Sequence, residues 1–479
     1  MRTGKRLCIV VVFILLSITL AAPAYAGTIT VDTLADGTGI PGCSLREAIT
    51  RANAGSDGEG CTGVTGSPNT IALSLSGSYT LTTGSALPAI SSDITIQESG
   101  GAAAVIEAAT LPNTAAYRVL SVNGTTSILT LNGVTVRNGG TSSTALTGGC
   151  ILVINAADLI LTGGTVVEDC RTSGNGGAIY ATTAVNTITV TNSTIQNNTA
   201  GGSGGGIYWD SGTVSVSGST FSGNVAAAHG GGIYVSNNSA FSVSGSTFDD
   251  NQANGTGASV NGGAIYWANV FTTGTISSST FTNNTATGSS NNNGGAIFQG
   301  GGGTVEITDS VFTGNSVTGA GGDGGVFFIS LGTMRVIGSR IQSNNSPDTA
   351  RGDVVRVAGG SGVFIVRGSC IVNNGDTAVY GNENFDIIGR DTAGTGENWW
   401  GTAWGPQIAG VTGSQYSNGD SINGNGTSSS IVDVGWTSGG DEILVPPTGE
   451  WLTSAPTVAG AQCMTCTGAS SIGHARSCS

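Results

Sequence analysis

Short stretches of the chain alternate between apolar and polar residues, and such stretches recur through its middle part. In residues 213–224, Val214 and Val216 alternate with Ser215 and Ser217. A period of two is typical of a β-strand with one buried face and one exposed face. Glycine and asparagine separate these stretches, as they do at turns. The pattern therefore predicts a protein built from many short strands.

Two sequence elements repeat along this region. The first consists of two glycines, a small residue and an aliphatic or aromatic residue, and its copies end at Ile151, Ile179, Ile207, Ile233, Ile265, Ile297 and Phe327. The second is an aliphatic or aromatic residue three positions before an asparagine, and its asparagines are Asn198, Asn224, Asn251, Asn284, Asn315, Asn344 and Asn374. The copies recur about every 26–33 residues, which is within the range of solenoid repeats. The sequence therefore predicts an all-β parallel solenoid in which each repeat forms one rung.

Equivalent residues of stacked rungs should form columns, because the rungs lie about 4.8 Å apart. We expect the asparagines to form a hydrogen-bonded column, and the Phe or Ile that opens each second element to point into the core. The residue after each first element is aromatic in six copies, namely Tyr180, Tyr208, Tyr234, Tyr266, Phe298 and Phe328. Two interpretations of this aromatic ladder remain. It is either an outward surface that holds a glycan or another partner, or a structural stack that is buried or covered.

The first 26 residues have the features of a secretory signal peptide. Arg2, Lys5 and Arg6 precede an apolar segment, and residues 24–26 form an A-x-A cleavage site. An uncleaved membrane anchor is the alternative, but the apolar segment has about 14 residues, whereas a membrane span needs about 20. We therefore expect export and no transmembrane span in the mature chain.

The charge of the chain limits its partners. The formal net charge is -14, and only 9% of the residues are charged. Cleavage after residue 26 would remove three positive charges, among them Lys5, which is the only lysine, and would leave a net charge of -17. An acidic surface without lysine argues against nucleic acid or anionic lipid as a partner.

One segment near the N-terminus has a clear helical pattern, residues 43–54. Ser44 and Glu47 have the spacing of a capping box. The apolar residues that follow at helical spacing are Leu45, Ala48, Ile49 and Ala52. A parallel solenoid has an open end at its first rung, with unpaired backbone groups. We therefore predict that this helix is an N-terminal cap over that end.

Eight cysteines remain after the signal peptide, and an even number in an exported protein fits disulfide bonds. Cys43 begins the helix and Cys61 follows it, so we expect a short disulfide between them. The sequence leaves the connectivity of the other cysteines open.

Three segments resemble known families. GCSLREAITRANA, residues 42–54, resembles the CSLREA domain of secreted bacterial proteins. The repeated elements are similar to those of chlamydial polymorphic outer membrane proteins, and ENWWGTAWGP, residues 397–406, resembles the closing segment of bacterial right-handed β-helix repeat proteins. The resemblance implies a right-handed, single-stranded parallel β-helix, export and an adhesin-like surface role, without catalytic residues. The expected regions are a signal peptide (1–26), a CSLREA cap region (27–110), β-helix repeats (111–395) and a closing segment with a cysteine-containing tail (396–479).

Several residues suggest chemistry, and each has a structural alternative. Asp249 and Asp250 suggest the paired carboxylates of a glycosidase, but they occupy variable positions that fit a surface turn. His229 precedes three glycines, and we expect it to face solvent in a loop. Trp399, Trp400 and Trp404 suggest sugar binding, but plugging the C-terminal end of the core is the preferred interpretation.

A group of arginines lies in the later repeats with two aspartates, and its members are Arg335, Arg340, Arg351, Arg356, Arg367, Asp348 and Asp353. Such a group suggests a lyase site with a bound cation, although the sequence lacks a calcium-binding series of acids. Ordinary ion pairing between rungs is the preferred interpretation.

The sequence as a whole favours an exported, non-enzymatic β-helix protein, adhesin-like or structural, at the cell surface or in the extracellular medium. The expected partners are glycans or components of host or neighbouring cell surfaces, and no catalytic, cofactor or metal residue is assigned. The alternative is a polysaccharide-active enzyme, either a lyase or a glycoside hydrolase, on the same scaffold.

Overall fold

The protein is described by a computed structural model. The described residues are 27–347 apart from 102, 142–146, 183–185, 238–239, 258 and 269–272, then 352–358, 362–367, 369–372 and 374, and the strand segments 379–381, 386–387, 407–408, 421–424, 457–458 and 461–462. The expected signal peptide and the tryptophans Trp399, Trp400 and Trp404 lie outside the described residues. In the described part of the chain, no helix is long and apolar enough to cross a membrane.

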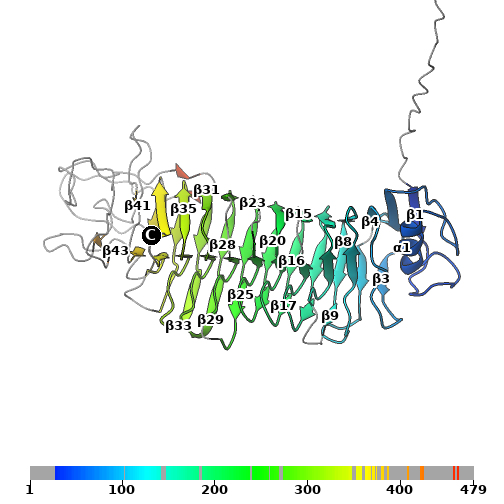
Figure 1. The fold of residues 1–479 in the computed structure, drawn as a ribbon, viewed down its shortest axis with the longest axis horizontal. Coiled ribbons are helices and arrows are strands. Elements are labelled where there is room, and N and C mark those ends of the chain that lie inside the picture. The colour runs from blue at the N-terminus through cyan, green and yellow to red at the C-terminus, as the bar shows by residue number, and fades with distance from the viewer. Residues whose placement is uncertain are drawn as a thin grey trace, which may run out of the picture.

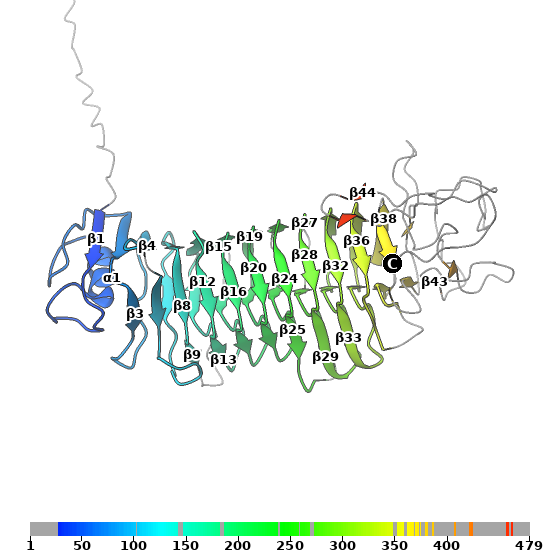
Figure 2. The same ribbon diagram turned by 180° about the vertical axis from the view of Figure 1, so that it is seen from behind.

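The described chain forms an elongated stack of parallel strands, with the N-terminal helix at one end (Figures 1 and 2). The first sheet has 13 strands: β1 (Gly27–Val31), β2 (Asn69–Leu73), β4 (Ile94–Glu98), β7 (Ile128–Asn132), β11 (Asp158–Thr162), β15 (Asn186–Thr191), β19 (Gly212–Ser217), β23 (Ala240–Ser244), β27 (Thr273–Ser277), β31 (Thr304–Thr308), β35 (Gly332–Ile337), β38 (Gly362–Arg367) and β41 (Asp386–Ile387). The second sheet has 12: β6 (Leu120–Asn123), β10 (Ile151–Ile154), β14 (Ile179–Ala181), β18 (Ile207–Trp209), β22 (Ile233–Val235), β26 (Ile265–Trp267), β30 (Ile297–Gln299), β34 (Phe327–Ile329), β37 (Val355–Val357), β40 (Val379–Gly381), β43 (Ser421–Gly424) and β42 (Gln407–Ile408).

Two further sheets have fewer strands. The third sheet has 11 strands: β3 (Gly77–Thr80), β5 (Ala104–Glu107), β8 (Val134–Arg137), β12 (Val166–Glu168), β16 (Thr194–Gln196), β20 (Thr220–Ser222), β24 (Thr247–Asp249), β28 (Thr280–Thr282), β32 (Val311–Thr313), β36 (Arg340–Gln342) and β39 (Cys370–Val372). The fourth has seven: β9 (Gly140–Thr141), β13 (Arg171–Thr172), β17 (Thr199–Ala200), β21 (Val225–Ala226), β25 (Gln252–Asn254), β29 (Thr285–Ser290) and β33 (Ser316–Ala320). An antiparallel pair, β44 (Thr457–Val458) and β45 (Ala461–Gln462), stands apart from these sheets.

The rungs that contribute a strand to all four sheets visit these sheets in the same order. From β14 in the second sheet the chain passes to β15 in the first, β16 in the third and β17 in the fourth, and then returns to the second sheet as β18. Each strand pairs in parallel with its equivalents in the rungs before and after. The all-β parallel solenoid predicted from the repeats is therefore confirmed.

Alternation along the strands sorts side chains between the core and the surface. Val214 and Val216 are buried, while Ser215 and Ser217 lie on the outer face of β19. The Phe or Ile that opens each second element is also fully buried, and neighbouring rings such as Phe248 and Phe281 stack at 4.8 Å. The predicted inward orientation of these residues is confirmed.

The asparagine column is also confirmed. Each side-chain amide donates from Nδ2 to the Oδ1 of the asparagine in the next rung at 2.9–3.0 Å, from Asn198 through to Asn374. The same Oδ1 atoms accept the backbone N–H of the preceding asparagine, as Asn284 does from Asn251 at 3.1 Å. The column therefore satisfies buried polar groups at one corner of the rungs from β16 to β39.

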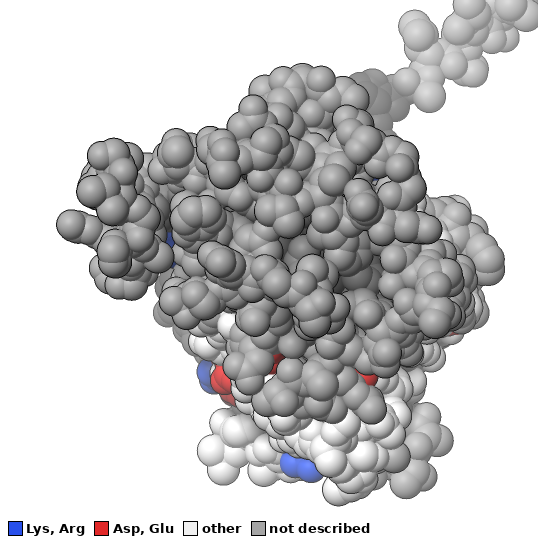
Figure 3. Space-filling view, turned by 90° about the vertical axis from the view of Figure 1, so that its left-hand side faces the viewer, with Lys and Arg blue, Asp and Glu red and all other residues white. Residues whose placement is uncertain are grey.

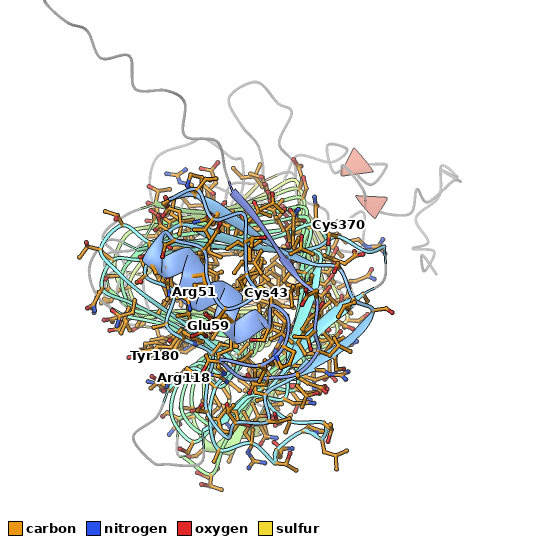
Figure 4. The ribbon with its side chains drawn as sticks, turned by 90° about the vertical axis from the view of Figure 1, so that its right-hand side faces the viewer. Cys43, Arg51, Glu59, Arg118, Tyr180 and Cys370 are labelled. Carbon is orange, nitrogen blue, oxygen red and sulfur yellow. A yellow bond between two sulfur atoms is a disulfide. The ribbon has the colours of Figure 1, made fainter. Side chains whose placement is uncertain are left out.

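Helix α1 (Leu45–Ala54) lies across the N-terminal end of the stack and packs against β1 and β2 (Figure 4). Ala48 and Ile49 on its inner side are fully buried, as predicted. Only half of the expected capping box forms. The Oγ of Ser44 accepts the N–H of Glu47 at 3.0 Å, but the Glu47 carboxylate binds Arg51 at 2.6 Å.

Two disulfides join cysteines that both lie among the described residues. One joins Cys43 to Cys61, with their Cα atoms 4.7 Å apart, which is the pairing expected from the sequence. The other joins Cys150 to Cys170. Cys370 is disulfide-bonded as well.

The cap region does not end in a structural boundary at residue 110. Strands β1, β2 and β4 come from residues 27–110, yet they are hydrogen-bonded into the first sheet in register with β7. The solenoid therefore begins at Gly27 and not at residue 111, and the cap consists of α1 and the loops around it.

Candidate binding surfaces

The aromatic ladder is a continuous stack on the outer side of the second sheet. The isoleucine before each tyrosine is buried, so the tyrosine points outward, as Ile179 and Tyr180 show. The five ring pairs from Tyr180 to Phe328 lie 4.7–5.1 Å apart with interplanar angles of 4–16°. Tyr180 lies at the periphery of the stack in the view along its axis (Figure 4).

This geometry changes what the ladder can bind. The tyrosine rings are half-buried, and Phe298 and Phe328 are only 7% and 8% exposed. A sugar packs on the flat face of an aromatic ring, but here neighbouring rings cover each other's faces. Ring edges and hydroxyl groups are what remain accessible. The ladder therefore fits the structural interpretation better than a platform for stacked sugars.

The tyrosine hydroxyls of the ladder are neutral hydrogen-bonding groups. Burial, and next the neighbouring Tyr234, raise the pKa of Tyr266 to about 12. Burial likewise raises the pKa of Tyr180, Tyr208 and Tyr234, and the nearby Asp210 carboxylate adds to the effect. A phenol with a raised pKa keeps its proton at neutral pH, so these groups are poor bases or nucleophiles.

His229 packs against the ladder, so the expectation that it faces solvent in a loop was wrong. Its ring stacks on Tyr266 at 4.5 Å, and within the described structure its buried Nδ1 has no hydrogen-bond partner. Burial lowers its pKa. The physical reason is its place directly before the glycine pair, where a parallel bridge joins it to Asn261 in the next rung. That register position is fixed even though the preceding loop varies in length.

The suspected pair of catalytic carboxylates lies at a turn. Asp249 ends β24, and Asp250 follows it in the left-handed conformation, with φ of 51°. Equivalent turn positions of other rungs are also left-handed, as at Asn283 and Gly314. Asp249 and Asp250 therefore belong to a repeated surface turn.

The arginine group is spread over three sheets. Arg335 lies on β35 of the first sheet, Arg340 on β36 of the third and Arg356 on β37 of the second. Arg356 is buried and pairs with Asp323 of the previous rung at 3.6 Å, which is the expected rung-to-rung ion pairing. Asp353 accepts the N–H of Ser346 at 2.8 Å. Arg351, Asp348 and the side chain of Arg367 lie outside the described residues.

Among the described residues, no group of three or more His, Cys, Asp or Glu side chains is placed to hold a metal ion. The described part of the surface seen in Figure 3 likewise shows few charged atoms among many uncharged ones.

Sequence reasoning missed a groove beside the fourth sheet. It has a volume of about 620 Å³, and its polar lining includes Asn113, Arg171, Ser173, Thr199 and Asn254. Arg171 is exposed at the start of β13. The groove spans several rungs, from the loop at Asn113 to β25. No sequence signal marked it, because its walls are the short strands of the fourth sheet and the loops next to them, and these segments lie outside the two repeated elements.

A second surface missed from the sequence is the outer face of the first sheet. From β15 to β27 each strand presents three outward positions, occupied by Thr187, Thr189, Thr191, Thr213, Ser215, Ser217, Ala240, Ser242, Ser244, Thr273, Thr275 and Ser277. Equivalent residues pair directly from strand to strand without a register shift. Alternation indicated outward polar residues, but only the strand pairing shows that they form a regular array in unshifted register.

Comparison with known proteins supports the fold and names no function. Residues 118–290 match a family model described as a right handed beta helix region. No curated protein and no solved structure matches the chain significantly. The matched segment begins just before β6 and ends with β29, all within the continuous stack of rungs. The fold is therefore a right-handed parallel β-helix.

Proposed function

We propose that this chain is an exported, non-enzymatic β-helix protein that acts by binding, adhesin-like or structural, at the cell surface or in the extracellular medium. The observation that carries this proposal is the repeated, largely uncharged outer surface, which offers the same hydroxyl and amide groups on one rung after another. Repeated weak contacts along a stiff solenoid add up to strong attachment, because each later contact forms within the same complex.

Export is supported by two features of different kinds. The N-terminal 26 residues resemble a signal peptide. The structure also contains the bonds Cys43–Cys61 and Cys150–Cys170, and structural disulfides persist in oxidising compartments. The resemblance of the repeats to those of polymorphic outer membrane proteins agrees with a surface role.

Glycans are the partners that we propose for the groove beside the fourth sheet. The guanidinium of Arg171 and the nearby Ser173, Thr199, Asn113 and Asn254 side chains are donors and acceptors suited to sugar hydroxyls or a sugar carboxylate. Hydrolysis of a glycosidic bond uses a pair of carboxylates. The described residues that line the groove include none, so binding suits this groove better than cleavage.

The test is a glycan array with the purified mature chain, run beside a depolymerisation assay on acidic polysaccharides. We expect binding that weakens in Arg171→Gln, with no change in polymer length. Arg335→Gln, which removes a charge from the first sheet instead, is the matched control. Depolymerisation by a clean preparation, reduced by Asp249→Asn or Arg171→Gln, would instead favour the polysaccharide-active enzyme.

A further inference from the structure

The array on the first sheet is regular in two directions. Along a strand, outward side chains alternate with buried ones such as Ile188 and Val214, so they recur every two residues, or about 6.6 Å. Across strands, equivalent side chains recur about every 4.8 Å. Strands β15, β19, β23 and β27 contribute three outward residues each, and all of these are Thr, Ser or Ala. The adjoining strand β11 presents Asp158, Ile160 and Thr162, and β31 presents Thr304, Glu306 and Thr308, so the array of small uncharged residues ends at β15 and β27.

The array stands on a rigid base. The residues that alternate with it are fully buried in the core, and the backbone beneath is hydrogen-bonded to strands on both sides. Neighbouring hydroxyls also fix each other, as Thr191 and Ser217 do at 3.1 Å and Ser242 and Ser215 do at 3.3 Å. A hydroxyl has one donor and two acceptor sites, so each can still bind an external oxygen.

A surface with two fixed repeat distances matches a crystal lattice better than a flexible chain. A single glycan chain follows one direction and would use one column at a time. Hexagonal ice repeats its oxygen atoms at distances close to both spacings of this array. Small uncharged hydroxyl and methyl groups order nearby water, but they do not bind it in hydration shells as ions do.

We propose that the outer face of the first sheet from β15 to β27 binds ice. Hydroxyls of the Thr and Ser columns would replace water oxygens of the lattice, and the threonine methyls would lie between them. This activity goes beyond the proposed attachment function and uses a different surface from the Arg171 groove.

The outer face of the third sheet provides an internal comparison. From β12 onward its strands are three residues long and present two outward positions, for example Thr220 and Ser222 on β20. The columns include charged residues, such as Asp249 and Arg340. This face is narrower and less uniform, so we expect it to contribute little.

The experiment measures inhibition of ice recrystallisation and thermal hysteresis with the full mature chain. Ser215→Tyr places a bulky ring in the centre of the array, and Ser222→Tyr makes the same change on the third sheet of the same rung. We expect the parent to inhibit recrystallisation, Ser215→Tyr to lose about tenfold in activity and Ser222→Tyr to keep it. Ser215→Thr combined with Ser242→Thr adds two methyls to the array and should raise the activity. Circular dichroism would check that every variant is folded.

Two results would overturn the proposal. One is a folded parent protein without effect on ice growth, and the other is an equal loss in Ser215→Tyr and Ser222→Tyr. The glycan array separates this outcome from failure of the proposed function. Ser215→Tyr should bind glycans like the parent, whereas Arg171→Gln should act on ice like the parent.

Discussion

Replacing Asn284 with alanine tests the hydrogen-bonded column most directly. The Asn284 side chain is fully buried. Its Oδ1 accepts from the backbone N–H and the Nδ2 of Asn251 at 3.1 and 3.0 Å. Its Nδ2 donates to the carbonyl of Phe248 and to the Oδ1 of Asn315, both at 2.9 Å. One substitution therefore breaks four hydrogen bonds inside the core.

The size of the effect follows from the groups that lose these bonds. The Nδ2 of Asn251 keeps a bond to the Phe221 carbonyl, and the Oδ1 of Asn315 keeps the backbone N–H of residue 284. The carbonyl of Phe248 also lies in the parallel ladder between β24 and β28, so it keeps a partner there. The N–H of Asn251 has no such compensation. A buried polar group without a partner costs about 1–3 kcal/mol, so Asn284→Ala should destabilise the fold by about 1–3 kcal/mol.

The assay is urea unfolding followed by circular dichroism, with Asn283→Gly as the control. Asn283 is exposed and left-handed, with φ of 54°, and glycine occupies the equivalent turn position at Gly314. The control should stay within about 0.5 kcal/mol of the parent. Midpoints are the quantity to compare, because the rungs of a solenoid need not unfold together. Equal midpoints for Asn284→Ala and Asn283→Gly would refute the stabilising role of the column.

Three further substitutions test the core, the cap and the acid response. Phe281→Ala should cost about 3–5 kcal/mol in chemical denaturation, and Thr282→Ser at the neighbouring outward position at most about 0.5 kcal/mol; equal effects would mean that the strand faces are reversed. Glu47→Pro removes the N–H that caps α1 and the partner of Arg51, and should give aggregation in size-exclusion chromatography; an unchanged monomer would show that the helix is not an end cap. Although burial opposes it, hydrogen bonds from Arg46 and Thr83 lower the pKa of Asp36. The Asp36→Asn variant should therefore be less stable than the parent at pH 7, and this difference should shrink as the pH falls below about 5. A difference in thermal midpoint between the two proteins that stays constant with pH would contradict this.

The fold could be predicted from the sequence where every rung repeats the same environment. The position of Phe281 recurs as Phe248 and Phe312; Phe248 and Phe281 each lie between two stacked rings, and Phe312 stacks on Phe281. The asparagine three residues later recurs with the same partners. Repetition along the chain is therefore enough to identify both the buried face of these strands and the corner that follows them.

Contacts that depend on a single loop or a single neighbour were not predictable in this way. The carboxylate of Glu47 turns to Arg51, which also lies 3.4 Å from Glu59 in the loop after the helix. The capping-box spacing of Ser44 and Glu47 carries no information about Arg51. His229 likewise lies on Tyr266 of the next rung, a contact set by register and not by adjacent sequence. The groove at Arg171 depends on strands and loops from several rungs.

In the core, a tryptophan from one sheet fills the space left by a glycine of another sheet. In the sequence these two residues appear only as two unrelated irregularities. On the inner face of the first sheet, Phe241 is followed in the next rung by Gly274, where the repeat favours a large residue. On the second sheet, Trp267 replaces the smaller Val235 of the rung before. The indole of Trp267 fills the space over Gly274, so that a Cβ there would overlap it, and its ring packs edge-on against Phe241 at 5.1 Å. A glycine that looks like a defect in one column thus accommodates a tryptophan from another, and core volume is conserved for the rung as a whole and not position by position.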